Sequence, residues 1–178
     1  MLAAIAFYAR CIDRVNEIVG RAAAWLLLAV VGICFTGVVL RYVFGIGFVW
    51  VQDAYVWLHA VILTLVAGFA LKDGRHVRVD LVYGRVGRRA RAWIDLLGVF
   101  AFLMPFCIVL LIHGYGWAER SWALAERSVN VGGLPGLYLV KSTLPAMAVL
   151  LALQGLALAG RSVLVLAGDR DPAEDARA

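Results

Sequence analysis

The chain has little charge and lacks the motifs that enzymes use to bind nucleotides or to activate a nucleophile. Charged residues make up 16% of it and hydrophobic residues 63%, whereas a soluble domain has about 25% and 45–50%. It has no P-loop, no glycine-rich dinucleotide fingerprint and no nucleophile elbow. Its three cysteines, Cys11, Cys34 and Cys107, have neither disulfide nor metal-binding spacing. We therefore expect no enzyme activity, no cofactor, no metal and no nucleic-acid partner.

The hydrophobic residues are concentrated in four runs. Residues 22–40, 54–71, 96–118 and 142–160 contain no Lys, Arg, Asp or Glu. A helix needs about 20 residues to cross the apolar core of a bilayer. The pattern predicts an all-α integral membrane protein with one membrane domain, residues 21–166. Its four transmembrane helices are expected over about 22–42, 49–71, 93–118 and 137–160.

The segments on either side of this domain are polar or amphipathic. Residues 1–20 are predicted to form an amphipathic helix in the cytoplasmic interface, because their apolar residues recur every three or four positions. The alternative is that this segment extends the first transmembrane helix into the cytosol. The first apolar run is longer than a signal-peptide core, so we expect an uncleaved anchor. Residues 167–178 are polar and contain a proline, which predicts a disordered tail.

Positive charge is concentrated between the second and third runs. Residues 72–91 hold seven of the 17 Lys and Arg residues. With both termini in the cytoplasm, 13 positive residues lie inside and 4 outside, and the reverse orientation exchanges these numbers. Lys and Arg near span ends determine orientation, so both termini are predicted to be cytoplasmic. We also expect Lys72 to Arg91 to attract anionic lipid headgroups.

A few ionisable residues lie at membrane depth. Arg41 ends the first span and Asp53 lies about one turn inside the second, so we expect an interfacial ion pair; a role in ion or substrate transit is the alternative. His59 and His113 raise the possibility of a haem held between two helices. A buried, hydrogen-bonded histidine is the commoner situation.

Small residues and prolines suggest how the last helices pack. Four small residues recur on one face of the fourth span and predict close docking, either inside the bundle or against another subunit: Ala148, Ala152, Gly155 and Ala159. Such a stripe can also arise from the high alanine content. Pro105 and Pro145 are expected to kink their helices, and Pro135 is expected to open the fourth helix.

Motifs in a fixed order resemble a known family. Arg41-Tyr42-Val43-Phe44 closes the first span, and Trp50-Val51-Gln52-Asp53 opens the second. After the second span come Gly74, His76, Arg78, Val79 and Asp80, and around the fourth come Pro135, Pro145 and Gln154. Together they resemble the small, DctQ-like membrane subunit of tripartite ATP-independent periplasmic (TRAP) transporters. Gln52 departs from the pattern, because the family commonly has an acid there, and only the second acid, Asp53, is present.

The resemblance implies a division of labour. A periplasmic binding protein would capture an organic acid such as a dicarboxylate or sugar acid. A large membrane subunit of about twelve helices would carry it with sodium across the bacterial inner membrane. The small subunit would be a non-catalytic scaffold for the large one. A haem-binding electron-transfer subunit and a self-contained small channel or exporter are the alternatives.

Overall fold

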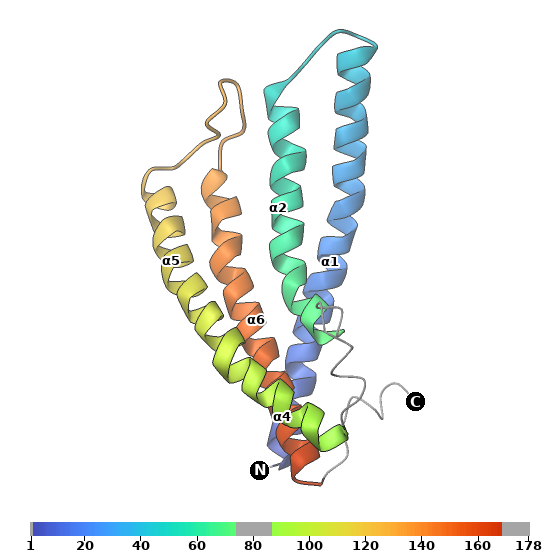
Figure 1. The fold of residues 1–178 in the computed structure, drawn as a ribbon. Helices are drawn as coiled ribbons and strands as arrows, with labels where there is room; N and C mark the ends of the chain where they lie inside the picture. Colours follow the sequence, from blue (N-terminus) through green and yellow to red (C-terminus); the bar gives the residue numbers. More distant parts are fainter. Residues whose placement is uncertain (1, 74–86, 169–178) are drawn as a thin grey trace.

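The computed structural model describes residues 2–73 and 87–168 and consists of long, nearly parallel helices (Figure 1). Helix α1 spans Leu2–Tyr42 and α2 spans Val49–Lys72. Helix α4 (Arg88–Gly98), the π-helical turn η1 (Val99–Leu103) and α5 (Met104–Ala123) follow one another without a break, and α6 spans Leu137–Leu166. Counting α4 to α5 as one, the described ranges contain four helices long and apolar enough to cross a membrane. The prediction of an all-helical protein with four such helices is confirmed.

Helix α1 is longer than the span predicted for it. It runs from Leu2 without interruption through residues 20 and 21 to Tyr42. The N-terminal segment is therefore continuous with the first span, as in the alternative in which it extends that helix. At the other end of the chain, α6 continues to Leu166, and most of the predicted tail lies outside the described residues.

Proline shapes two of the helices, in different ways. Pro105 is the second residue after η1, where the chain is π-helical. Its ring would clash with the carbonyl of the residue four positions earlier, and one wider turn relieves such a clash. Helix α6 continues past Pro145. Pro135 does not open α6: it forms an isolated bridge with Arg127, and α6 begins only after Gly136, whose φ of 98° is left-handed.

Helix α6 forms the centre of the bundle. In its most apolar window 44% of the residues are buried, compared with 6% in α1 and α2. It contacts α1, α2, α4 and α5. Of the small-residue stripe, Ala148, Gly155 and Ala159 are buried and Ala152 is half-buried, so this face lies inside the bundle. A side chain at Gly155 would begin 2.5 Å from Cδ2 of Leu103, so η1 packs directly on α6.

Candidate functional site

Two groups of polar contacts that join the helices lie near the two ends of the bundle. We call the first group the loop cluster: Asp53 with three residues of the α5–α6 connection, Ser128, Asn130 and Leu134. Asn130 donates to Asp53 Oδ1 at 3.0 Å, and the backbone N–H of Leu134 donates to Oδ2 at 3.1 Å. The Ser128 side chain also hydrogen-bonds this carboxylate. Asp53 thus ties the beginning of α2 to the loop between α5 and α6.

Glycine is required beside this carboxylate. A Cβ at Gly133 would lie 2.2 Å from Asp53 Oδ2 and 2.6 Å from Ser128 Cβ. The loop backbone approaches Asp53 this closely only because residue 133 has no side chain.

The expected ion pair between Arg41 and Asp53 is wrong. Asp53 is buried and its carboxylate is used by the loop cluster, whereas Arg41 is exposed. The salt bridges found within residues 2–73 and 87–168 do not include this pair. The physical reason is that three neutral donors from the loop satisfy the carboxylate without a neighbouring cation.

A second set of contacts joins α5 to α6 below the same loop. Glu126 accepts from Ser121 at 2.6 Å and forms an ion pair with Lys141. The Lys141 hydrogen bond, followed by that of Ser121, holds the pKa of Glu126 below its ordinary value. Lys141 also lies over the ring of Trp117, 4.4 Å from its centroid. The residue after Lys141, Ser142, accepts a hydrogen bond from the Trp122 indole N–H at 2.8 Å. Charge, hydrogen bonding and aromatic contact therefore fix α5 against α6.

We call the second group the base cluster: half-buried Asp13 and buried Asn16 of α1 with buried Gln154 and Arg161 of α6. Gln154 is 0% exposed and donates to Asp13 Oδ1 at 2.8 Å. It accepts from Asn16 Nδ2 at 2.7 Å. Arg161 donates to the other Asp13 oxygen at 2.7 Å. The N-terminal half of α1 is thereby fixed to the C-terminal half of α6.

The base cluster also determines how closely α2 can approach. Oδ1 of Asn16 is buried and has no hydrogen-bond donor. It lies against the backbone of Gly68, where a Cβ would be 2.2 Å away. Beside it, Lys72 of α2 forms an ion pair with Glu17 of α1 at 3.0 Å.

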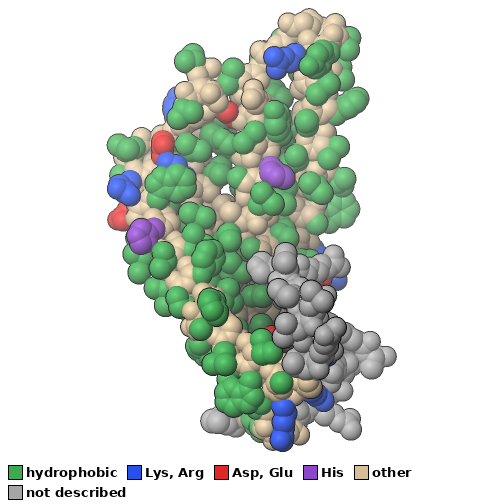
Figure 2. Space-filling view, viewed as in Figure 1, with side chains coloured by type: hydrophobic (Ala, Val, Ile, Leu, Met, Phe, Trp, Pro, Cys, Tyr) green, Lys and Arg blue, Asp and Glu red, His purple; other side chains and the backbone are tan. Residues whose placement is uncertain are grey.

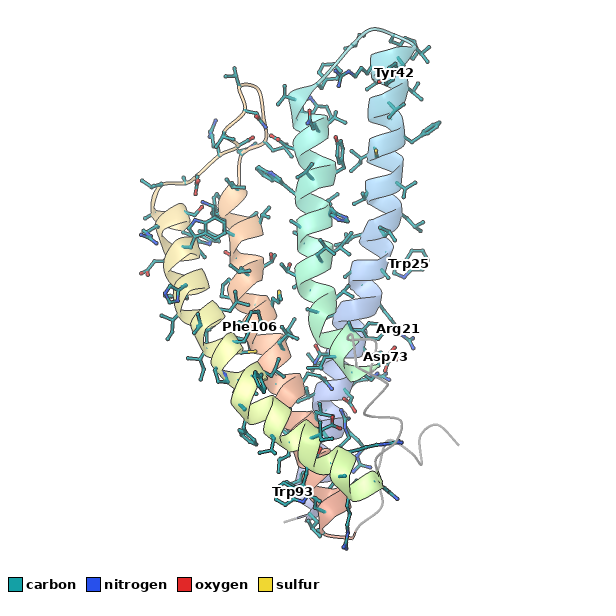
Figure 3. The ribbon with its side chains drawn as sticks, in the orientation of Figure 1. Arg21, Trp25, Tyr42, Asp73, Trp93 and Phe106 are labelled. Atoms are coloured by element: carbon teal, nitrogen blue, oxygen red, sulfur yellow. The ribbon has the colours of Figure 1, made fainter. Side chains whose placement is uncertain are left out.

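The remaining residues singled out in the sequence are dispersed. Gly74, His76, Arg78 and Asp80 lie outside the described residues. Tyr42 projects from the end of α1 and is 81% exposed (Figure 3). Trp50 packs on Phe48, with ring centroids 5.9 Å apart. Of the motif residues in this group that the structure describes, Tyr42 and Trp50 take part in separate contacts.

The two histidines considered for haem are not placed as a ligand pair. His59 is on α2 and His113 is on α5, and both are exposed rather than buried. Figure 2 shows histidine side chains as separate groups on the surface. His113 Nδ1 lies 2.9 Å from the carbonyl oxygen of Val109 in its own helix. The expectation of buried, hydrogen-bonded histidines is also wrong, because the exposed faces of these helices can remain in contact with lipid.

Sequence reasoning missed most of the base cluster. Asp13 lies in the segment predicted to be an amphipathic interfacial helix, and Arg161 directly follows the fourth predicted span. Their opposite signs beyond the same predicted membrane boundary were the available signal. Gln154, which the motif comparison did single out, proves to be the residue that joins the others.

The chemistry available here is structural. Within residues 2–73 and 87–168, no three His, Cys, Asp or Glu side chains are grouped so as to hold a metal ion. Asp53, Asn16, Gln154 and Arg161 use their polar atoms mainly on one another or on nearby loop groups. Such an arrangement fixes helices relative to each other.

Comparison with known proteins identifies the family. Residues 30–164 match the model of the DctQ component of tripartite ATP-independent periplasmic transporters. A Vibrio cholerae serotype O1 protein described as the C4-dicarboxylate TRAP transporter small permease protein DctQ is 28% identical over 104 residues. That alignment covers 56% of this chain and 44% of the relative, so the chain matches less than half of the relative's length. No solved structure matches significantly. Because the family match covers most of the chain, this protein belongs to the DctQ component family of TRAP transporters, small permeases of the inner membrane.

Proposed function

We propose that this chain is the scaffold against which the large membrane subunit of a sodium-coupled transporter moves. The observation that carries the proposal is the use of its buried polar groups. Among the described residues, each buried polar side chain makes a hydrogen bond within the chain: Asn16, Asp53, Ser121, Gln154, Arg161 and Ser162. A transport path near the bilayer midplane needs polar groups that remain available to the solute. Groups that hold helices together suit a rigid support.

The outer surface is consistent with a subunit embedded in lipid and protein. Large apolar side chains are exposed along α1 and α5, including Leu28, Phe35, Phe106 and Ile112. Hydrophobic side chains dominate the face shown in Figure 2. An exposed apolar surface of this kind can contact either lipid or another membrane protein. The proposed scaffold would place one of these faces against a large subunit of about twelve helices.

The name of one distant relative supports a proposal for the substrate class. The V. cholerae relative is named for C4-dicarboxylates, and we propose an organic acid of the dicarboxylate or sugar-acid type for this system. A periplasmic binding protein would capture it, and the large subunit would carry it with sodium. Substrate choice would then reside outside this chain.

We also propose that both termini face the cytoplasm. The excess of Lys and Arg flanking the spans supports this orientation. It would place the base cluster near the cytoplasm and the loop cluster near the periplasm. Single cysteines at Asn130 and at Glu174, in a background without Cys11, Cys34 and Cys107, test it. An impermeant thiol reagent applied to spheroplasts should label position 130 only; labelling of position 174 alone would reverse the orientation.

Co-purification provides the direct test of the scaffold proposal. The affinity-tagged chain should co-purify with a much larger membrane protein whose gene lies beside its own. Transport in reconstituted vesicles should require both proteins and a sodium gradient. The large subunit alone should be inactive or unstable. The proposal fails if the large subunit transports at full rate without this chain, or if this chain alone moves the solute.

A further inference from the structure

A hollow lies between the end of α1 and the beginning of α2. Its volume is about 520 Å³. Three glycines of its lining, Gly37, Gly45 and Gly47, contribute no side chain to fill it, and Val38, Leu40 and Val51 make much of its wall apolar.

Among the residues that the structure describes, Arg41 is the one charged residue in this lining. The described residues give its guanidinium neither an ion pair nor a hydrogen bond, since Asp53 is used by the loop cluster. The polar neighbours Gln52 and Tyr55 carry no charge at neutral pH. Within the part of the chain that the structure describes, the hollow therefore combines a partly apolar wall with one positive charge that has no ion-pair partner.

The position of Arg41 places this charge at the surface of a bilayer. It follows 19 residues without charge, from Ala22 to Leu40, and lies at the end of a candidate span. Tyr42 ends α1 and Trp50 lies in the first turn of α2, and such aromatic side chains prefer the headgroup level. This placement holds for either orientation of the chain in the membrane.

We propose that this hollow binds one phospholipid. The phosphate would accept hydrogen bonds from the Arg41 guanidinium, whose planar fork fits phosphate oxygens. Phe48 gives α2 no side-chain cap, so N–H groups of its first turn also face this end. One acyl chain would follow the apolar wall between α1 and α2. The inference does not depend on the proposed scaffold role.

Apolar walls favour a lipid over a free phosphate ion. A small anion would leave the wall in contact with water, whereas an acyl chain would cover it. Arg41 would attract the negatively charged phosphate, and the apolar part of the wall would be covered by an acyl chain. The ligand is therefore expected to need both its phosphate and its chains.

Native mass spectrometry of the full chain in detergent tests whether the positive charge of Arg41 contributes to lipid binding. Phosphatidylglycerol is titrated against the wild type, Arg41→Gln and Arg120→Gln. Arg120 is the matched control, because it is exposed but absent from the lining of the hollow. Loss of one basic contact should weaken phosphatidylglycerol binding about fivefold in Arg41→Gln and leave Arg120→Gln within twofold. Equal weakening in the two variants would reduce the effect to general attraction and overturn the proposal.

A second pair of variants tests the hollow without changing charge. Gly47 lines it and Gly32 does not, and neither has an atom within 4 Å of an added Cβ. Gly47→Phe should displace the lipid, whereas Gly32→Phe should not.

Inorganic phosphate at millimolar concentration should fail to compete with phosphatidylglycerol. Effective competition by phosphate, or unchanged lipid binding in Gly47→Phe, would contradict the proposal. If the Arg41→Gln variant no longer binds the large subunit but still binds the lipid, then Arg41 pairs with a carboxylate of that subunit and the lipid proposal is wrong.

Discussion

Gln154→Met is the most informative single substitution in this protein. Methionine keeps the unbranched shape of the side chain but removes both polar atoms of the amide. Asn16 Nδ2 then loses its 2.7 Å bond and retains only a 3.4 Å contact to the carbonyl of Ile12. Asp13 loses one of its two donors and keeps Arg161.

The cost follows from the exposure of each partner. Asn16 is 1% exposed, so leaving its amide unsatisfied should cost about 1–3 kcal/mol. The hydrogen bond to the Asp13 carboxylate would contribute about 1.5–3 kcal/mol if fully buried. The Asp13 side chain is 22% exposed, so water replaces part of that bond. We expect the free energy of unfolding to fall by about 2–4 kcal/mol.

The chain offers its own probe of unfolding. Cys107 is buried, and Cys11 and Cys34 are exposed. With both exposed cysteines changed to serine, thiol labelling of Cys107 reports unfolding as SDS is added to mixed micelles. Thr36→Val is the control, because Thr36 is exposed and bonds only within its own helix, and its effect should stay below about 0.5 kcal/mol.

A double mutant isolates the amide contact. Asn16→Leu keeps the branched outline of the side chain and removes the partner that Gln154→Met leaves unsatisfied. The double variant should therefore be more stable than the sum of the single effects predicts, by about 1 kcal/mol or more. Strict additivity, or a Gln154→Met protein with the wild-type unfolding midpoint, would refute the assigned role of the base cluster.

Three other substitutions test separate parts of the fold. Asp53→Asn should destabilise the α5–α6 loop by about 1–3 kcal/mol because an amide is a weaker acceptor than a carboxylate, and faster amide hydrogen exchange in that loop would reveal it. Gly155→Leu should cost about 1–3 kcal/mol because its side chain would collide with Leu103, whereas Gly32→Leu, with open space around it, should have little effect on the same thiol-labelling midpoint. Because the pKa of Glu126 is lowered in the folded protein, its contribution is complete above the unfolded-state pKa and is lost as pH falls through the folded-state value. Glu126→Gln should flatten this acid limb of the thermal-unfolding midpoint, and an unchanged limb would contradict the assignment.

Most of the helical framework follows from the sequence because of a simple constraint. Backbone polar groups in lipid must be satisfied within the segment, so a charge-free run of about 20 residues forms a helix. The beginnings of α2 at Val49 and α6 at Leu137 coincide with the predicted spans. Pro105 likewise indicated where the third helix is perturbed. The sequence did not predict that the perturbation is a π-helical turn.

Polar partners were far less predictable than helices. The sequence placed Arg41 and Asp53 at one level of the membrane, but level does not determine which way each side chain points. Asp53 turns toward the α5–α6 loop, 77 residues away at Asn130, and Arg41 remains exposed. Asp13 likewise turns inward to Arg161, because the whole N-terminal half of α1 lies alongside α6.

The sequence by itself determined that this is a helical membrane protein, and its ordered motifs indicated the DctQ family. Both follow from local information, namely the length of each apolar run and the residues at its ends. Only the tertiary structure decided which polar residues meet, that α6 is the central helix, and that Arg41 lines a hollow and has no ion pair with any described residue. Those outcomes depend on the rotation and contact of helices distant in sequence, and no single run of residues encodes them.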